Sequence, residues 1–590
     1  MNRFFVLAML LLAACYLLPL SRLLQEPLWG TGFPVIRTGW LAAGVMSAGV
    51  ALAARHLPWR GMRLLYAAVV LVCIPALFPH PMTSVGATLC QLSLLAMAVL
   101  VAGGIAGNAR ARRADRVVVT GLMMAGAAVT LWTLTEFYRP DLIFQVYHIR
   151  VTGGRMPGLL MQPNVTGSFL AVVVTLGLWR WLRSGKRHSG GWLGGLAAVM
   201  AAMHATQSTI ALLGTFTGFV LLYLAFGRGA SRAFGLAAVV LLAGWAVTLW
   251  HPGTGVLSRE YENSWGFRLQ MLRASLALVM VKPWLGWGYG SFAGVFPKGL
   301  AILGEHQMDT HSTPEHPHNE LMYWMVQGGL VAAAGIVLIA VWGLRLLIRA
   351  FPGRQHAESA LRSGDGWGWG VCVVPVVLHM QTEFPLYVSA LHWLVLSVCA
   401  GLALAAVREQ EAAMPGCPPF TRRRPWLSVP VRCAGVAAGG AAIWFTVTAA
   451  LIDTELNRIP VVLKWYPVQR LLDTRALNPW ADSARYEGTL GLLYMEAWTN
   501  GPRDGRVLER AINGLQRSAI ARPDPNTWRY LMQAYRLAGD TAGEAAARDA
   551  IHRVIRYVFS DETLATLSVP GVNPVSATTS GPTGTRPRAP

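Results

Sequence analysis

Long apolar stretches recur along the first three quarters of the chain, separated by short polar segments. Each stretch is roughly twenty residues long, which is enough for an α-helix to cross a hydrocarbon core of about 30 Å. The pattern therefore predicts about thirteen membrane-spanning helices. The predicted spans are 4–20, 38–54, 62–78, 85–107, 117–135, 167–181, 190–206, 208–226, 233–250, 319–342, 366–386, 388–407 and 431–451.

The polar connections between these spans alternate in charge. Segment 421–432 (TRRRPWLSVPVR) is strongly basic, whereas segment 204–208 (HATQS) contains no Lys or Arg. Because Lys and Arg are retained on the cytoplasmic side of a membrane, the basic connections are predicted to be cytoplasmic. Loop 136–166, loop 251–318 and everything after residue 451 are then predicted to lie on the outer side.

The overall composition supports a membrane protein. Hydrophobic residues make up 54% of the 590 residues and charged residues only 13%, whereas about a quarter of the residues of a soluble domain are charged. The net charge of +21 is accounted for by basic residues in the cytoplasmic loops and the outer domain, so no nucleic-acid partner is predicted.

After Leu451 the long apolar runs stop and charged residues return. Helical patterns broken by Pro fill residues 452–559, and the segment from Pro523 to Gly539 is similar to a degenerate tetratricopeptide (TPR) repeat. The tail 560–590 is rich in Pro, Ser, Thr and Gly and is predicted to be disordered. The predicted fold class is an all-α polytopic membrane helix bundle with a C-terminal, TPR-like α-helical domain.

The outer loops hold the candidate functional residues. Loop 136–166 contains GGRMPGLLMQPNVTGSF, with Arg155, Gln162 and Asn164 just before a span; the alternative is ordinary turn chemistry, with Asn164 or Thr166 capping the next helix. In loop 251–318, Arg268 and Arg273 begin an amphipathic helix, which is expected to lie along the outer face with its Arg side chains available to an anion. A helix that merely snorkels at the interface is the alternative.

Three histidines stand in HSTPEHPHNELMYW, residues 311–324. A metal site would need converging ligands, whereas His316 and His318 flank a Pro in a loop. The other interpretation is a single reactive His318 at the membrane surface, with Asn319 capping the helix that follows.

A further motif, VLHMQTEFPLY at 377–387, places His379 and Glu383 four residues apart. On one helix they would share a face, and an ionisable pair near lipid is by default a functional hypothesis. A mutually satisfied pair at a helix end is the alternative. Guanidinium groups suit a phosphate or pyrophosphate, and a nearby His or Glu suits deprotonation of a hydroxyl. The combination indicates transfer of a group carried on a lipid phosphate.

The order of these motifs, RMPGLLMQPN, KPWLGWGYGSF and HPHNELMYWMVQGGL, resembles the bacterial O-antigen ligase and O-antigen polymerase superfamily. HMQTEFPLY resembles a motif of its protein O-oligosaccharyltransferase branch, which modifies pilins. The resemblance implies a metal-independent glycosyltransferase without cofactors in the bacterial inner membrane. Its active site would be formed by periplasmic loops 136–166 and 251–318 of a membrane domain spanning 1–451, with the helical domain 452–559 also in the periplasm.

The implied donor is an oligosaccharide on undecaprenyl pyrophosphate, and the implied acceptor is a Ser or Thr hydroxyl of a periplasmic protein such as pilin. By the resemblance, Arg155 and Arg268 hold the pyrophosphate and His318 is the catalytic histidine. Gln162 and Asn164 shape the donor site, and His379 with Glu383 supports the acceptor side. The expected site residues are His318, Arg268, Glu383, His379, Arg155, Gln162, Asn164, Arg273 and Asn319.

The chain departs from the family pattern at Thr209, where an Arg is expected, and the role of His316 is open. Two other functions remain as alternatives. An O-antigen ligase or polymerase would use the same chemistry on a lipid A core sugar or a lipid-linked repeat. A lipid-linked glycan transporter would place ionisable residues near the bilayer midplane and show internal repeats, neither of which the sequence displays.

Overall fold

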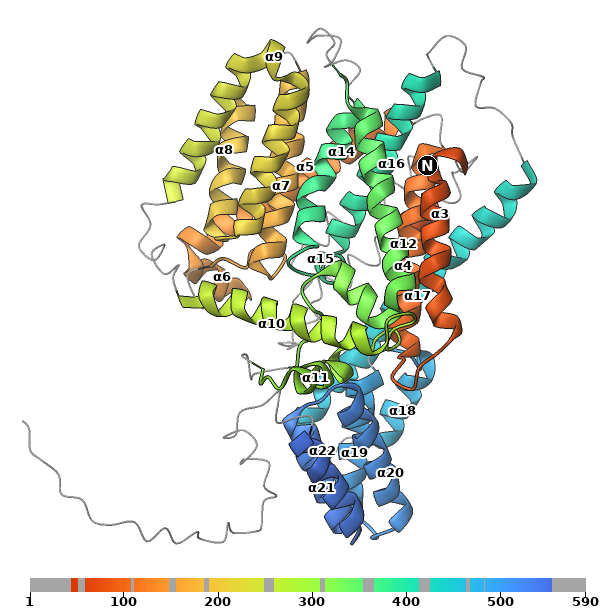
Figure 1. Ribbon diagram of the computed structural model, residues 1–590. Coiled ribbons are helices and arrows are strands. Elements are labelled where there is room, and N and C mark those ends of the chain that lie inside the picture. The colour runs from red at the N-terminus through yellow and green to blue at the C-terminus, as the bar shows by residue number, and fades with distance from the viewer. Residues whose placement is uncertain are drawn as a thin grey trace, which may run out of the picture.

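The computed structural model describes residues 44–50, 59–107, 111–147, 155–184, 190–248, 259–307, 313–353, 365–412, 425–462, 467–481 and 483–553. All regular elements in these ranges are helices, which confirms the all-α class. Figure 1 shows long helices side by side in a bundle, with a smaller group of helices at one end. The predicted disordered tail 560–590 lies outside the described residues.

The bundle combines long helices with a few shorter ones. Its helices are α3 (Trp59–Cys73), α4 (Val85–Ala106), α5 (Ala111–Tyr138), α7 (Pro163–Arg183), α8 (Gly190–Ala205), α9 (Thr209–Val247), α12 (Glu320–Ala350), α14 (Asp365–His379), α16 (Ala390–Ala412) and α17 (Pro425–Val462). The short elements η2 (Ile74–Leu77), α6 (Pro140–Tyr147) and α15 (Pro385–Val388) connect them.

Eight helical segments of the described chain are long and apolar enough to cross a membrane. This number is smaller than the predicted thirteen. The predicted span 4–20 lies outside the described residues, and only 44–50 of the predicted span 38–54 is described. Helices α3, α8 and α14 have only 15 or 16 residues each. The two spans predicted within 208–250 are the halves of α9, which bends at Ala230.

Helices α7 and α16 form the centre of the bundle. Both are apolar on all sides and almost entirely buried, as expected for helices that touch protein rather than lipid. Small residues allow the close approach, since a Cβ on Gly368 of α14 would lie 2.0 Å from the Trp179 indole. The C-terminal part of α7 is thereby held close against the first turn of α14.

The interrupted segment 282–291 lies against α12 rather than in lipid. Leu330 N–H donates to Pro283 O at 2.7 Å, and Trp287 N–H donates to Val326 O at 2.9 Å. The insertion interrupts α12 at Gly329, whose φ of 66° is readily adopted only by glycine. The backbone groups freed by the break are therefore satisfied within the protein, as a membrane requires.

One end of the bundle is covered by α10 (Arg259–Val281) and α11 (Phe292–Leu303). Figure 1 shows α10 lying across this end, as expected from its sequence. One side of α10 is buried at Met271, Ala274 and Leu278, and the other exposes Leu269 and Met280. This helix therefore has the two apolar sides of an element placed between protein and lipid.

The C-terminal helices pack against α10 and α11. They are α18 (Val468–Leu477), α19 (Ser483–Asn500), α20 (Gly505–Ala521), α21 (Pro525–Leu537) and α22 (Thr541–Arg553). Leu515 of α20 and Leu531 of α21 belong to the same apolar cluster as Phe296 of α11. The helical content predicted for this region is confirmed, and its tetratricopeptide character stays a prediction.

Candidate active site

One buried carboxylate, Glu383, connects residues from distant parts of the chain. Arg268 Nη2 on α10 donates to Glu383 Oε1 at 2.6 Å, and Asn164 Nδ2 at the start of α7 donates to the same oxygen at 3.1 Å. His318 Nδ1 lies 3.1 Å from the other oxygen, Oε2. Arg155 completes the cluster, because its Nη2 donates to Asn164 Oδ1 at 2.8 Å. We call these five residues the Glu383 network.

His318 is the partly accessible member of the network, with 24% of its side chain exposed. It precedes α12 and has a left-handed backbone with φ of 54°. A carboxylate facing Nδ1 favours the tautomer with its proton on that nitrogen. The other ring nitrogen, Nε2, is then the one available to accept a proton.

His316 is buried and contacts the backbone of His318. Its ring centroid lies 4.0 Å from that of Tyr323 and 4.8 Å from that of Phe384. Burial lowers the pKa of His316, which favours the neutral ring, and His316 Nδ1 accepts the His318 N–H at 3.1 Å. His316 therefore supports the backbone of His318.

The end of the histidine loop is held by Asn319. Its Oδ1 accepts the Met322 N–H at 3.0 Å, which confirms the predicted cap of α12, and its Nδ2 donates to Gln381 O at 3.2 Å. His311 lies outside the described residues. Within those residues no group of three or more His, Cys, Asp or Glu side chains is arranged to hold a metal ion.

The segment before α7 is shaped by its own hydrogen bonds. Gln162, not Asn164 or Thr166, caps α7, because its Oε1 accepts the Val165 N–H at 2.6 Å. Thr166 Oγ1 instead donates to Pro157 O at 2.5 Å, and buried Glu136 accepts the Gly158 N–H at 2.8 Å. The alternative in which Asn164 is only a cap is therefore wrong, and its side chain is free to bridge Arg155 and Glu383.

His379 and Glu383 do not share a helix face, contrary to the sequence expectation. Helix α14 ends at His379, and Glu383 lies in the following turn, where its N–H donates to His379 O at 3.0 Å. Pro385 disfavours helical backbone in the residue before it, and the turn directs the Glu383 carboxylate toward Arg268. The two side chains therefore make separate contacts, and the alternative of a mutually satisfied pair is wrong as well.

The buried His379 belongs to a chain of alternating Ser and His side chains. Its Nδ1 lies 2.7 Å from Ser168 Oγ, which lies 2.8 Å from His392 Nε2. His392 Nδ1 in turn lies 2.8 Å from Ser389 Oγ. This chain joins α7, α14 and α16 directly beneath the Glu383 network.

Arg273 lies outside the network. Its Nη2 contacts Glu305 Oε1 at 2.8 Å, and 58% of its side chain is exposed. Arg268 and Arg273 are five residues apart, which places them on different sides of α10. Both arginines are candidate site residues in the sequence, but in the structure only Arg268 contacts Glu383.

Backbone strain is concentrated around the site. In the part of the chain that the structure describes, the non-glycine residues with positive φ are Met161, Gln207 and His318. Each lies in a loop next to the Glu383 network, and Arg155 Nε donates to Thr206 O beside Gln207 at 3.4 Å. Such conformations cost about 1–3 kcal/mol each and are concentrated at functional sites.

The charge of Glu383 is stabilised by its neighbours. Burial alone would raise the pKa of this carboxyl, but the hydrogen bond from His318 and the positive charge of Arg268 hold it well below its usual range. Glu383 is therefore ionised at neutral pH and balances the positive charge of Arg268.

Three residues of the site were missed from the sequence: Glu136, Ser168 and His392. His392 lies inside a predicted span, where an ionisable side chain is itself a signal of function. Glu136 gave a similar signal, as the carboxylate immediately after the predicted span 117–135. Ser168 gave none, because an isolated Ser in a span is common.

Comparison with known protein families gives one match. Residues 195–337 match the family described as O-antigen ligase. The matched range contains Arg268 and His318 of the Glu383 network. A search of curated proteins found no match. Residues 195–337 of this polytopic helical protein are thus similar to the O-antigen ligase family.

Proposed function

We propose that this protein transfers an oligosaccharide from undecaprenyl pyrophosphate to a Ser or Thr hydroxyl of a periplasmic protein such as pilin. The O-antigen ligase match supports a glycosyltransferase of the ligase type. The single observation that carries the proposal is the Glu383 network. It combines two guanidinium groups with a histidine oriented by a carboxylate, at the end of the bundle predicted to face outward.

Arg155 and Arg268 are suited to the pyrophosphate leaving group. Arg268 uses its Nη2 on Glu383, and a guanidinium has five N–H donors, so others are available to phosphate oxygens. Negative charge grows on the pyrophosphate as the bond from the anomeric carbon to oxygen breaks. Fixed positive groups stabilise that charge in a site shielded from water.

His318 is suited to be the general base. In the proposed step the acceptor oxygen forms a bond to the anomeric carbon and its proton passes to His318 Nε2, while the pyrophosphate departs with the bonding electrons. Glu383 stabilises the imidazolium that results, in the way that a carboxylate supports a catalytic histidine. His379 and Gln162 then act as positioning residues, through Ser168 and the N-terminus of α7.

A protein acceptor is favoured by the contact between the C-terminal helices and the histidine loop. Thr313 Oγ1 donates to Pro523 O at 2.7 Å, and Arg522 pairs with Glu315 at 2.6 Å. A helical domain touching the loop that carries the base is well placed to present a protein hydroxyl. The TEFPLY motif favours the same acceptor by resemblance.

The second candidate is an O-antigen ligase that uses a lipid A core sugar, and the description of the matching family favours it. Both functions share donor, base and leaving group. They differ only in the acceptor, so an acceptor test separates them.

The deciding experiment is glycan transfer in detergent from an undecaprenyl-pyrophosphate donor, with pilin and lipid A core as alternative acceptors and a metal chelator present. We expect wild type to modify pilin and His318→Ala to be inactive. Modification of lipid A core alone would reassign the acceptor. Absence of transfer to either acceptor would refute the ligase chemistry.

A further inference from the structure

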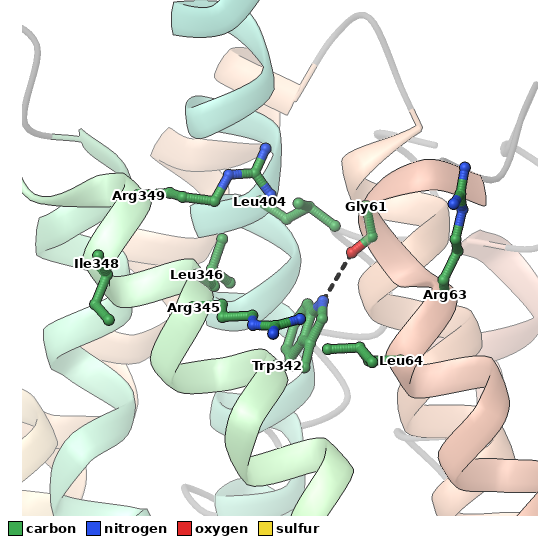
Figure 2. A pocket seen from close by; sticks show the side chains of 9 residues that line it. All are labelled: Gly61, Arg63, Leu64, Trp342, Arg345, Leu346, Ile348, Arg349 and Leu404. Carbon is green, nitrogen blue, oxygen red and sulfur yellow. Dashed lines mark hydrogen bonds between the residues drawn. The ribbon is translucent and has the colours of Figure 1, made fainter.

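A second polar feature lies at the opposite end of the bundle from Glu383. A cavity of about 360 Å³ opens between α3, α12 and α16, as Figure 2 shows. Twenty-five residues of α12, interrupted by the break at Gly329, separate Glu320 at its start from Arg345 in the cavity wall, and their helical rise of roughly 37 Å is comparable with a hydrocarbon core of about 30 Å. The cavity therefore lies at the other membrane surface, which the loop charges predict to be cytoplasmic.

Positive charge dominates the cavity. Arg63 of α3 and Arg345 and Arg349 of α12 are among its lining residues. Arg349 forms an ion pair with Glu411 of α16. Neither Arg63 nor Arg345 has a carboxylate partner within the described ranges, and both are exposed. The site therefore has an excess of guanidinium groups, which bind phosphate well.

The rest of the cavity wall is mostly apolar. Leu64, Leu346 and Leu404 line it, and Trp342 Nε1 donates to Gly61 O at 2.8 Å, which joins α12 to α3 across the cavity. Figure 2 shows this bond between the two helices, with Arg345 beside Trp342. A phosphate alone would make no use of the leucine side chains.

Exposed apolar side chains continue from the cavity wall onto the surface of the bundle. Leu344 and Ile348 of α12 are 59% and 64% exposed, as expected for side chains that meet acyl chains. We propose that the cavity binds one anionic phospholipid of the adjacent leaflet. Its phosphate contacts Arg63 and Arg345, and its glycerol and upper acyl carbons lie against Leu64, Leu346 and Leu404.

This site is independent of the proposed reaction. It shares no residue with the Glu383 network, and its ligand comes from the leaflet opposite to the proposed donor. A lipid bound between α3 and α12 would stabilise the helix pair whose other end carries the segment holding His318.

The test measures binding of phosphatidylglycerol to the full-length protein purified in detergent, by native mass spectrometry and by the lipid-dependent rise in melting temperature. Arg63→Gln/Arg345→Gln is compared with Arg116→Gln/Arg232→Gln, which removes the same charge from exposed positions outside the cavity. Arg63→Lys/Arg345→Lys retains the charge without the planar fork.

We expect the cavity pair to weaken phosphatidylglycerol binding at least tenfold, the control pair to change it less than twofold, and the lysine pair to keep most of it. Equal binding by wild type and the Gln cavity pair would overturn the proposal. So would equal losses in the Gln and Lys pairs, since packing rather than charge would then be responsible. Stabilisation by phosphatidylethanolamine, or by glycerol phosphate without acyl chains, to the same extent would overturn the assignment to an anionic lipid.

Discussion

Arg268→Ala tests the proposed chemistry most directly. The side chain donates to Glu383 at 2.6 Å and is 22% exposed, so it is a largely buried charge at the entrance to the network. We expect its removal to lower the rate of glycan transfer at least a hundredfold, with membrane insertion unchanged.

The magnitude follows from the charge that forms in the reaction. Removal of one preorganised donor to a developing oxyanion costs about 2.7–4 kcal/mol. Each 1.36 kcal/mol corresponds to about a tenfold change in rate, so the loss is roughly 10²–10³. Glu383 keeps the hydrogen bond from Asn164 and the contact with His318, so we add no further penalty for its lost partner.

The assay is single-turnover transfer from purified donor, with Arg273→Ala as the matched control on the same helix. Arg273 pairs with Glu305 instead of Glu383, and we expect less than a threefold loss. Arg268→Lys should fall between wild type and Arg268→Ala, because it keeps the charge and loses the planar fork. Activity of Arg268→Ala within threefold of wild type, or equal losses at both positions, would refute the reasoning.

Three other predictions concern the histidine and its carboxylate. In a plot of transfer rate against pH, His318→Gln should lack one sloping limb that wild type shows. An unchanged profile shape would exclude the general-base role. Glu383→Gln should lower transfer at least tenfold, whereas Glu487→Gln, which breaks an exposed pair with Arg517, should leave it unchanged because such pairs contribute about 0–1 kcal/mol. The lowered pKa of Glu383 adds folding stability that is fully present above the ordinary pKa of 4.5 and is lost as the pH falls toward about 2. The difference in melting temperature between wild type and Glu383→Gln should therefore shrink over that pH range. A constant difference would contradict this prediction.

The sequence predicted the helices well because each long apolar run has one stable form in a membrane. The sequence analysis placed 366–386 in one span, whereas the chain divides there into α14, a turn and α15. Apolar residues on both sides of the polar segment MQTE led to a single span, although Pro385 signals a break. The break at Gly329 in α12 was hidden. It depends on segment 282–291, which is distant in the chain.

For the candidate site, the residue types indicated which side chains take part, but the sequence did not indicate which of them contact one another. Arg155, Arg268, His318 and Glu383 could be selected because guanidinium groups suit a phosphate and because ionisable groups close to apolar lipid are costly and by default functional. Their convergence on one carboxylate depends on packing among α7, α10 and α14. For the same reason Arg273, identical in type and close in sequence to Arg268, could not be distinguished from it without the structure.

Thr313 and Glu315 of the histidine loop contact the turn between α20 and α21, and this contact matters for any attempt to redirect the proposed transferase to a new acceptor. Pro523 and Arg522 in that turn touch the same loop that carries His318, so the C-terminal helices are not an independent module. A chimera that imports a foreign C-terminal domain without matching residues at this contact would disturb the loop as well as the proposed acceptor surface. Successful retargeting will require grafting surface residues onto the native helices and leaving their junction with the membrane part intact.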